Sequence, residues 1–253
     1  MKRKVLSIIE LALVIIIVFS SYKVFSKMYR YKKDEKTYND ITKEYKVDKI
    51  GNIDKAADKS KSSKAANQAE YKSLYDKLNI RNTDYRFWLR VENTNINYPV
   101  VQASDNKYYL KHDINKAASI SGCPFVNCDN NVKTDKNVIV YGHNMRRNNM
   151  FNQLERFKES QFFNGDNNIV ITDKEGDHIY KVFSVYTMKS NDELGKTNYS
   201  IKDEFFEAVK AMQSKSFYYK DIKVADNDRI LTLVTCTYEI NDGRLVVEAK
   251  SVS

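Results

Sequence analysis

Proline and glycine are scarce in this sequence. The 253 residues include two prolines and seven glycines, whereas collagen-like and low-complexity chains are rich in one or both. No internal repeat is visible either. The length and the 42% hydrophobic content instead fit one core-bearing domain with appendages.

A nucleic-acid-binding motif is also absent, although the formal net charge is +9. Much of the lysine excess lies before residue 65. The basic balance therefore describes an N-terminal segment, and not a nucleic-acid groove, which would combine a basic patch with a recognisable motif. We expect no nucleic-acid partner.

Cysteine and histidine are few, with three of each. Cys123 and Cys128 lie close together, but no further cysteine or nearby histidine completes a zinc-binding set with them. A disulfide between them would be allowed outside the cell, yet we favour two unpaired, partly buried thiols without a catalytic role. We expect no metal and no cofactor.

The first strong positive signal is an apolar N-terminal run. Residues 5–22 are long enough to span a membrane, although Glu10 would be costly near the middle of the bilayer. The residues that follow lack the small-residue pattern of a signal-peptide cleavage site. We therefore favour an uncleaved anchor at 5–22 after a short tail at 1–4. Basic residues flank both ends of the run, so counting them leaves the orientation undecided.

Residues 23–63 are polar and rich in lysine, and we interpret them as a stalk. Tyr38, Ile41 and Tyr45 have helical spacing within it, while 51–63 is the expected flexible part. The pattern then changes, and 64–82 is predicted to be an amphipathic helix that packs on a partner surface. Its apolar face consists of Tyr71, Leu74, Tyr75 and Leu78.

Residues 83–253 alternate short apolar runs with turn-forming residues, which is typical of strands. About eight runs are present, at 87–91, 95–101, 121–126, 137–143, 168–172, 178–186, 229–235 and 244–249. Helices are expected at 150–157 and 202–214. Many short strands with few helices favour a closed, antiparallel or mixed barrel over a doubly wound sheet. The predicted fold class is mainly β with α.

The most informative stretch is 229–250. Two apolar runs rich in β-branched residues flank a turn-forming segment at 237–243. Cys236 stands at the exit of the first run and Arg244 at the entry of the second. A hairpin would therefore hold a thiol beside a guanidinium at one rim of the sheet.

A base to activate the thiol must be one of the three histidines. His143 ends its run as Cys236 ends its own, so the two can meet at one rim of a barrel. His112 is expected to make a local hydrogen bond with Asp113 or the backbone, and His178 to be exposed after a turn. His143 is the best candidate base.

These residues resemble the class B sortases of Gram-positive bacteria. TLVTC at 232–236 is similar to the family's cysteine signature, and Arg244 stands where its arginine opens the next strand. YGHNM at 141–145 is similar to the histidine motif, and the segments at 94–102 and 150–157 are similar to those around it. The helix before the cysteine strand and the N-terminal helical extension favour class B over class A.

The resemblance covers about residues 65–253 and the N-terminal anchor. It implies a sortase-like, eight-stranded catalytic barrel outside the cell on a single-pass anchor with a cytoplasmic N-terminus. It also implies a transpeptidase that cleaves a C-terminal sorting motif, of the NPxTx or PxTG type, after its threonine. The enzyme would hold the acyl fragment as a thioester. The implied partners are surface proteins with sorting signals, an amine of the peptidoglycan precursor, and the membrane.

The resemblance also implies roles for three residues. Cys236 would be the nucleophile, with its thiolate stabilised by neighbouring cations. His143 would protonate the departing amine and then deprotonate the incoming one. Arg244 would bind the substrate carbonyl or the tetrahedral oxyanion.

The sequence departs from the family at two positions beside the cysteine. Val234 stands where serine is common, and Thr237 where an acidic residue is common; both can alter motif preference without stopping catalysis. Asn97, Val101 and Tyr141 resemble substrate-contacting positions of the family. For Val101 and Tyr141, simple packing within a strand is an equal alternative.

Two other functions stay open. A membrane-tethered cysteine protease would use the same Cys–His pair and give its acyl group to water. A non-catalytic wall-binding module would instead keep Cys236 as a small buried hydrophobe, which thiol labelling would detect.

Overall fold

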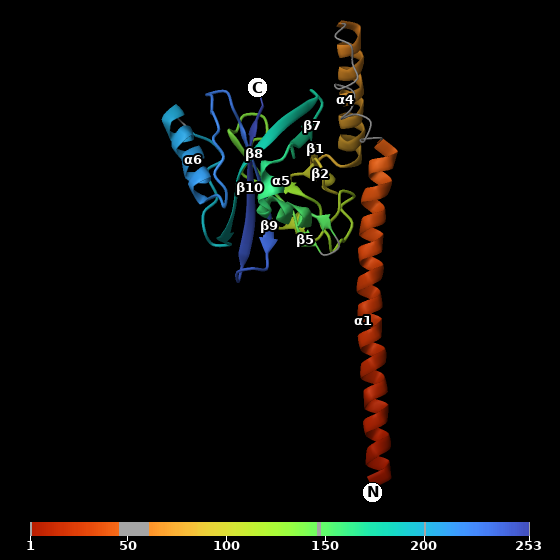
Figure 1. The fold of residues 1–253 in the computed structure, drawn as a ribbon. Coiled ribbons are helices and arrows are strands. Elements are labelled where there is room, and N and C mark those ends of the chain that lie inside the picture. The colour runs from red at the N-terminus through yellow and green to blue at the C-terminus, as the bar shows by residue number, and fades with distance from the viewer. Residues whose placement is uncertain (1, 46–60, 146–147, 200, 253) are drawn as a thin grey trace.

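The computed structural model describes residues 2–45, 61–145, 148–199 and 201–252 (Figure 1). Residue 1 of the predicted tail and residues 46–60, most of the expected flexible part of the stalk, lie outside the described residues.

The predicted anchor and the first half of the predicted stalk form one helix, α1 (Lys2–Tyr45). Among the described residues, it is the one helix long and apolar enough to cross a membrane, and its apolar stretch is exposed. Further along the helix, Asp34, Tyr38 and Ile41 are buried against the barrel. This part of the predicted stalk therefore packs on the folded domain, a contact that its polar composition did not predict.

The helix α4 (Lys61–Arg81) packs on the barrel as its apolar face predicts. Tyr71, Leu74 and Leu78 are buried, and the ring of Tyr75 lies 5.3 Å from that of Tyr85 in the first strand.

Eight strands form a closed barrel in the order β1-β2-β3-β4-β9-β10-β8-β7. The β2–β3 and β4–β9 pairs are parallel and the other neighbours antiparallel, which confirms the predicted eight-stranded mixed barrel. The strands are β1 (Tyr85–Val91), β2 (Asn97–Val101), β3 (Phe125–Val126), β4 (Asn137–Tyr141), β7 (Ile169–Thr172), β8 (Asp177–Lys189), β9 (Ile230–Thr237) and β10 (Gly243–Ser251).

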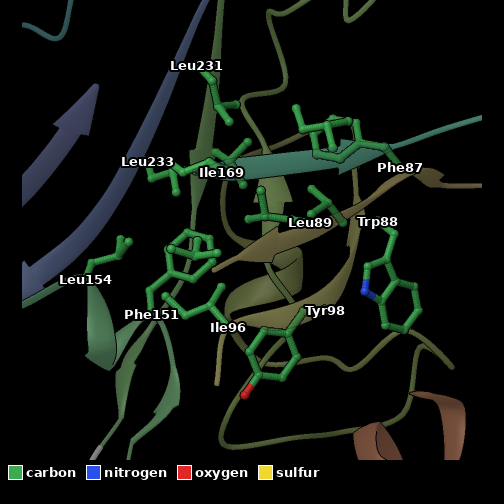
Figure 2. Packing of buried hydrophobic residues seen from close by; sticks show 14 of the residues in the cluster. Phe87, Trp88, Leu89, Ile96, Tyr98, Phe151, Leu154, Ile169, Leu231 and Leu233 are labelled. Atoms are coloured by element: carbon green, nitrogen blue, oxygen red, sulfur yellow. The ribbon is translucent and has the colours of Figure 1, made fainter. Parts of the chain in front are cut away.

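The barrel interior is a single apolar cluster, part of which Figure 2 shows. Leu89, Ile169, Leu231 and Leu233 meet there from three strands, β1, β7 and β9, with Phe151 beside them. Side chains alternate between the two faces of a strand, so the neighbours of these residues in sequence lie on the outer face.

The helix α6 (Lys202–Lys215) covers part of the outer face, at the position predicted for the helix before the cysteine strand. Phe205, Val209 and Met212 form its buried face and pack on Phe183 and Ile230.

Short elements complete the fold. The expected helix at 150–157 is the 3₁₀ helix η2 (Asn152–Lys158), which continues into α5 (Ser160–Asn164). A second 3₁₀ helix is η1 (Tyr108–Leu110). The two-residue strands β5 (Asn144–Met145) and β6 (Asn149–Met150) pair with each other. Figure 1 shows the β9–β10 connection at the end of the barrel that points toward the N-terminal end of α1, with the C-terminus at the other end.

Candidate active site

Cys236 and Arg244 face each other across the β9–β10 hairpin. They are direct register partners in the antiparallel pair, and such partners have Cβ atoms about 4.5–5.5 Å apart on the same side of the sheet. Leu231 and Leu233 point into the core, and alternation along the strand places Cys236 on the opposite face. Cys236 and its partner Arg244 therefore both lie on the outer face of the barrel. The thiol is exposed at the end of its strand.

His143 joins this row from the adjacent strand. Tyr141, the last residue of β4, is level with Val234 of the parallel strand β9. The pairing continues past the end of β4, because the Gly142 N–H donates to the Val234 carbonyl at 3.0 Å. His143 lies two residues beyond Tyr141, and Cys236 lies two residues beyond Val234, so the two are level with each other. The structure therefore brings the three predicted catalytic residues to one end of the barrel.

The ring of His143 is held by the backbone. Its Nε2 lies 2.8 Å from the main-chain oxygen of Leu110, at the end of η1. A carbonyl oxygen only accepts, so Nε2 is the protonated nitrogen in this bond. In the neutral ring, Nδ1 is then left to exchange a proton with substrate.

Asn144, the residue after the histidine, holds the cysteine strand. Its buried amide nitrogen donates to the carbonyl of Cys236 at 2.7 Å and to Glu155 Oε1 at 3.1 Å. Its amide oxygen accepts from Asn152 Nδ2 at 2.6 Å. Residues on η2 thus fix Asn144, and Asn144 fixes the backbone that carries the thiol.

A groove of about 480 Å³ lies beside Arg244 on the outer face. Arg244, Tyr141 and Ile139 contribute to its lining from β10 and β4, while Asn127 and the segment 192–197 line it from neighbouring loops. Within the described part of the chain, the half-buried guanidinium of Arg244 makes no hydrogen bond or ion pair. It is therefore free to bind an anionic or carbonyl oxygen.

Tyr141 lies next to that guanidinium. Burial raises the pKa of Tyr141, and the positive charge of Arg244 partly offsets the effect. The Tyr141 hydroxyl accepts a 3.3 Å hydrogen bond from Asn127 Nδ2. The ring forms part of the groove, which is compatible with the substrate contact predicted for it.

The other two predicted substrate-binding residues lie elsewhere. Val101 is fully buried in the barrel core, as in the packing alternative. Asn97 accepts a hydrogen bond from Trp88 Nε1 and lines a second, polar cavity beside Tyr38 of α1. Substrate contact by Asn97 or Val101 remains a prediction.

The remaining histidines make local contacts. His112 Nδ1 lies 2.8 Å from the carbonyl oxygen of Tyr108, and the two rings stack 4.1 Å apart, so the backbone bond expected for His112 is present. His178 pairs with Asp173 at 3.0 Å. The hydrogen bond to that carboxylate raises the pKa of His178.

All three cysteines are free, as expected for Cys123 and Cys128. Cys123 is fully buried, and burial raises the pKa of its thiol. Cys128 is half-buried, and partial burial beside Asp129 raises its pKa as well. Among the described residues, no group of three or more His, Cys, Asp or Glu side chains is arranged to hold a metal ion.

Sequence reasoning did not find Leu110 or Asn144. The contribution of Leu110 is a carbonyl oxygen, which every residue has, so residue type carries no signal for it. Asn144 directly follows His143 in the motif, and this adjacency was a usable signal.

Comparisons with known proteins show the family of this chain. The family model of the sortase domain matches residues 89–252. Sortase B of Staphylococcus aureus (strain NCTC 8325 / PS 47) is 27% identical over 253 residues, which are 99% of this chain and 98% of that protein.

Solved structures show the same fold. The X-ray structure of Clostridium perfringens sortase B is 43% identical with a TM-score of 0.67, covering 70% of this chain and 99% of that one. The Staphylococcus aureus sortase B–substrate complex is 25% identical with a TM-score of 0.75, covering 89% of this chain and 99% of that one. With its barrel, its N-terminal helices and its match to the sortase domain, this chain belongs to the sortase family as a class B sortase, a cysteine transpeptidase that sorts proteins to the cell wall.

Proposed function

We propose that Cys236, His143 and Arg244 cleave a C-terminal sorting motif of the NPxTx or PxTG type after its threonine and pass the protein to a cell-wall amine. The observation that carries this proposal is the row of three side chains at one end of the barrel. Cys236 and Arg244 are register partners, and the β4–β9 pairing brings His143 level with the thiol.

The reaction has two steps. The Cys236 thiolate attacks the threonine carbonyl carbon, and collapse of the adduct breaks the following amide bond. The departing nitrogen takes a proton from His143, and a thioester remains on Cys236. An incoming amine then attacks that carbonyl and gives its proton to His143. The thiolate leaves, so the enzyme is regenerated with one peptide bond exchanged for another.

Arg244 stabilises the charge that develops in both steps. Its guanidinium borders the groove without a competing ion pair among the described residues. In a partly desolvated site, a fixed donor aimed at the developing oxyanion contributes more than the same donor would in water. The groove between Tyr141 and residues 192–197 is the proposed binding site for the substrate residues that precede the scissile bond.

We also propose that residues 5–22 anchor the chain in the cell membrane, with the N-terminus in the cytoplasm and the barrel outside. The exposed apolar stretch of α1 supports this. The substrate and the acceptor amine of the proposed reaction would both be found on that outer side.

Product analysis tests the proposal. The full chain in detergent is incubated with sorting-motif peptides, with and without an amine acceptor, and the products are identified by mass spectrometry. We expect a thioester adduct on Cys236 and, with amine present, a new amide at the threonine. Cys236→Ala should keep its melting temperature and form no adduct, while Cys123→Ser and Cys128→Ser should stay active.

Other results would favour the alternatives. Hydrolysis alone, unchanged by added amine, would identify a cysteine protease. A non-catalytic module would need a buried, inert Cys236, whereas the residue is exposed.

A further inference from the structure

The helix that leaves the predicted anchor is bonded to a loop of the barrel through one buried carboxylate. Asp34 of α1 is 4% exposed. Its Oδ2 accepts hydrogen bonds from the Ser119 hydroxyl at 2.8 Å and from the N–H groups of Ile120 and Ser121 at 3.1 and 3.0 Å. The Tyr38 hydroxyl, one turn further along α1, donates to the carbonyl of Gly122.

The same loop is closed on itself around Ser119. The Ser119 hydroxyl oxygen accepts from the N–H groups of Ser121 and Gly122 at 3.1 and 3.0 Å. Residues 119–122, which we term the Asp34 loop, therefore direct the Ser119 hydroxyl and the N–H groups of residues 120–122 at the Asp34 carboxylate or the Ser119 oxygen. Removing the carboxylate would leave buried donors without an acceptor, which is costly.

The Asp34 loop in turn packs on η1. Gly122 has φ +63°, and a Cβ atom there would lie 2.4 Å from the carbonyl oxygen of Tyr109 and 3.1 Å from that of Leu110. On either side, Ser119 N–H donates to Lys111 and Cys123 N–H donates to Tyr109. The loop thus fixes the backbone of η1 by direct contact.

The packing of Gly122 on Leu110 connects the Asp34 loop to the proposed active site. The Leu110 carbonyl is the oxygen that holds Nε2 of His143. We propose that Asp34 is a positioning residue for the transpeptidase reaction. It fixes the Asp34 loop against η1, and η1 holds the imidazole of His143 in its orientation and tautomer. This inference rests on the proposed role of His143.

The test uses the full chain in detergent micelles and two variants. Asp34→Ala removes the acceptor, and Asp34→Asn keeps an oxygen of the same shape without the charge, so it is the variant more certain to fold. Asp40→Asn is the matched control, since Asp40 is an exposed aspartate on the same helix. Each protein is assayed for melting temperature, for kcat and KM on a sorting-motif peptide, and by nitrogen NMR of its imidazoles.

We expect the kcat of Asp34→Ala to fall about 10- to 100-fold with KM nearly unchanged, because a small misplacement of a catalytic group has effects of this size. Asp34→Asn should lie between Asp34→Ala and the parent, and Asp40→Asn should match the parent. The Nε2 signal of His143 should move in the Asp34 variants. The signal of His178, which pairs with Asp173 away from η1, should stay, so that it serves as an internal reference.

The NMR readout separates this inference from the proposed function. If the parent protein turns over no peptide, the proposed function fails, and the His143 signal still reports on its positioning. A His143 signal that is unchanged in both Asp34 variants would overturn the inference. If the parent is active, Asp34 variants in which the His143 signal moves but kcat equals that of the parent would also overturn it.

Discussion

Single residues at the proposed active site differ in how they are held. The backbone positions Cys236 and Arg244 through strand register, whereas His143 and Asn144 depend on individual hydrogen bonds from outside the β9–β10 hairpin. Substitutions of these residues should therefore differ in whether they change stability as well as turnover. Changes to Arg244 should affect chemistry alone, and changes to Asn144 should affect both stability and chemistry.

Arg244 gives the sharper test of chemistry. An arginine that served only a surface ion pair would contribute about 0–1 kcal/mol to stability, but this guanidinium makes no such pair within the described residues. We expect Arg244→Ala and Arg244→Lys to melt near the parent temperature and to lose roughly 10²–10³ in turnover. Lysine keeps the charge but lacks the planar fork. Peptide cleavage within a few-fold of the parent in Arg244→Ala would remove Arg244 from the mechanism.

Asn144 gives the complementary test. Asn144→Ala leaves the Cys236 carbonyl and Asn152 without a buried partner, so the free energy of unfolding should fall by about 1–3 kcal/mol. Turnover should also fall, about tenfold or more, because the thiol-bearing backbone is no longer fixed. Urea denaturation and peptide kinetics measure the two effects. Asn164→Ala, at an exposed asparagine bonded to Ser160, is the control, and equal behaviour of the two variants would contradict the role of Asn144.

At the scale of elements, the outer face of the barrel under α6 contains a buried acid. Glu248 of β10 is 1% exposed and accepts a 3.1 Å hydrogen bond from the Tyr186 hydroxyl. Burial raises the pKa of Glu248 to about 7. The folded barrel therefore favours the protonated acid at pH values where the unfolded chain would already be ionised.

The sign of the pH dependence follows from that shift. The acid is neutral in both states below its ordinary pKa near 4.5, and between 4.5 and 7 only the unfolded chain loses the proton. Stability should therefore fall as pH rises through this window, by roughly 3 kcal/mol in total. We expect Glu248→Gln to remove this fall and to melt higher than the parent at pH 8. Glu239→Gln, at an exposed position, should keep the parent's pH profile, and a profile unchanged by Glu248→Gln would refute the assignment.

Other elements show where sequence patterns were and were not sufficient. The barrel was predictable because its strands alternate or form short apolar runs, and His143 and Cys236 were predictable because each ends such a run. The pair β5–β6 was not predictable, since strands of two residues are too short to show an alternation of apolar and polar residues. Asp34 was not, because its partners at 119–121 are about 85 positions away. A polar residue on a polar helix gives no local sign of such contacts.

At the scale of the whole molecule, α1 has one part that is exposed and apolar and another part that packs on the barrel. Its first half exposes apolar side chains, and its second half contributes Tyr38 and Ile41 to the main core. The boundary between appendage and catalytic domain therefore falls within this helix, and truncation can locate it.

Deleting residues 1–26 should give a soluble, active protein, because the side chains of α1 that the structure describes as buried lie after that point. Deleting residues 1–45 should lower the free energy of unfolding by about 3–6 kcal/mol, since burial of Tyr38 and Ile41 is lost. Urea denaturation of the two proteins measures the difference. Equal stability would show that α1 contributes nothing to the fold, and aggregation of the shorter deletion would show that residues before 27 are needed.

The unbroken course of α1 also sets how far the enzyme can reach. The chain is helical from Tyr22 to Asp34, and the rise of about 1.5 Å per residue places these two residues roughly 18 Å apart along the helix axis. With the anchor in the proposed place, the β9–β10 end of the barrel points back toward the bilayer (Figure 1). A short, stiff tether of this kind raises the effective concentration of the thiol for anything held at the same surface. Membrane-held substrates would then be processed far more efficiently than the same motif free in solution.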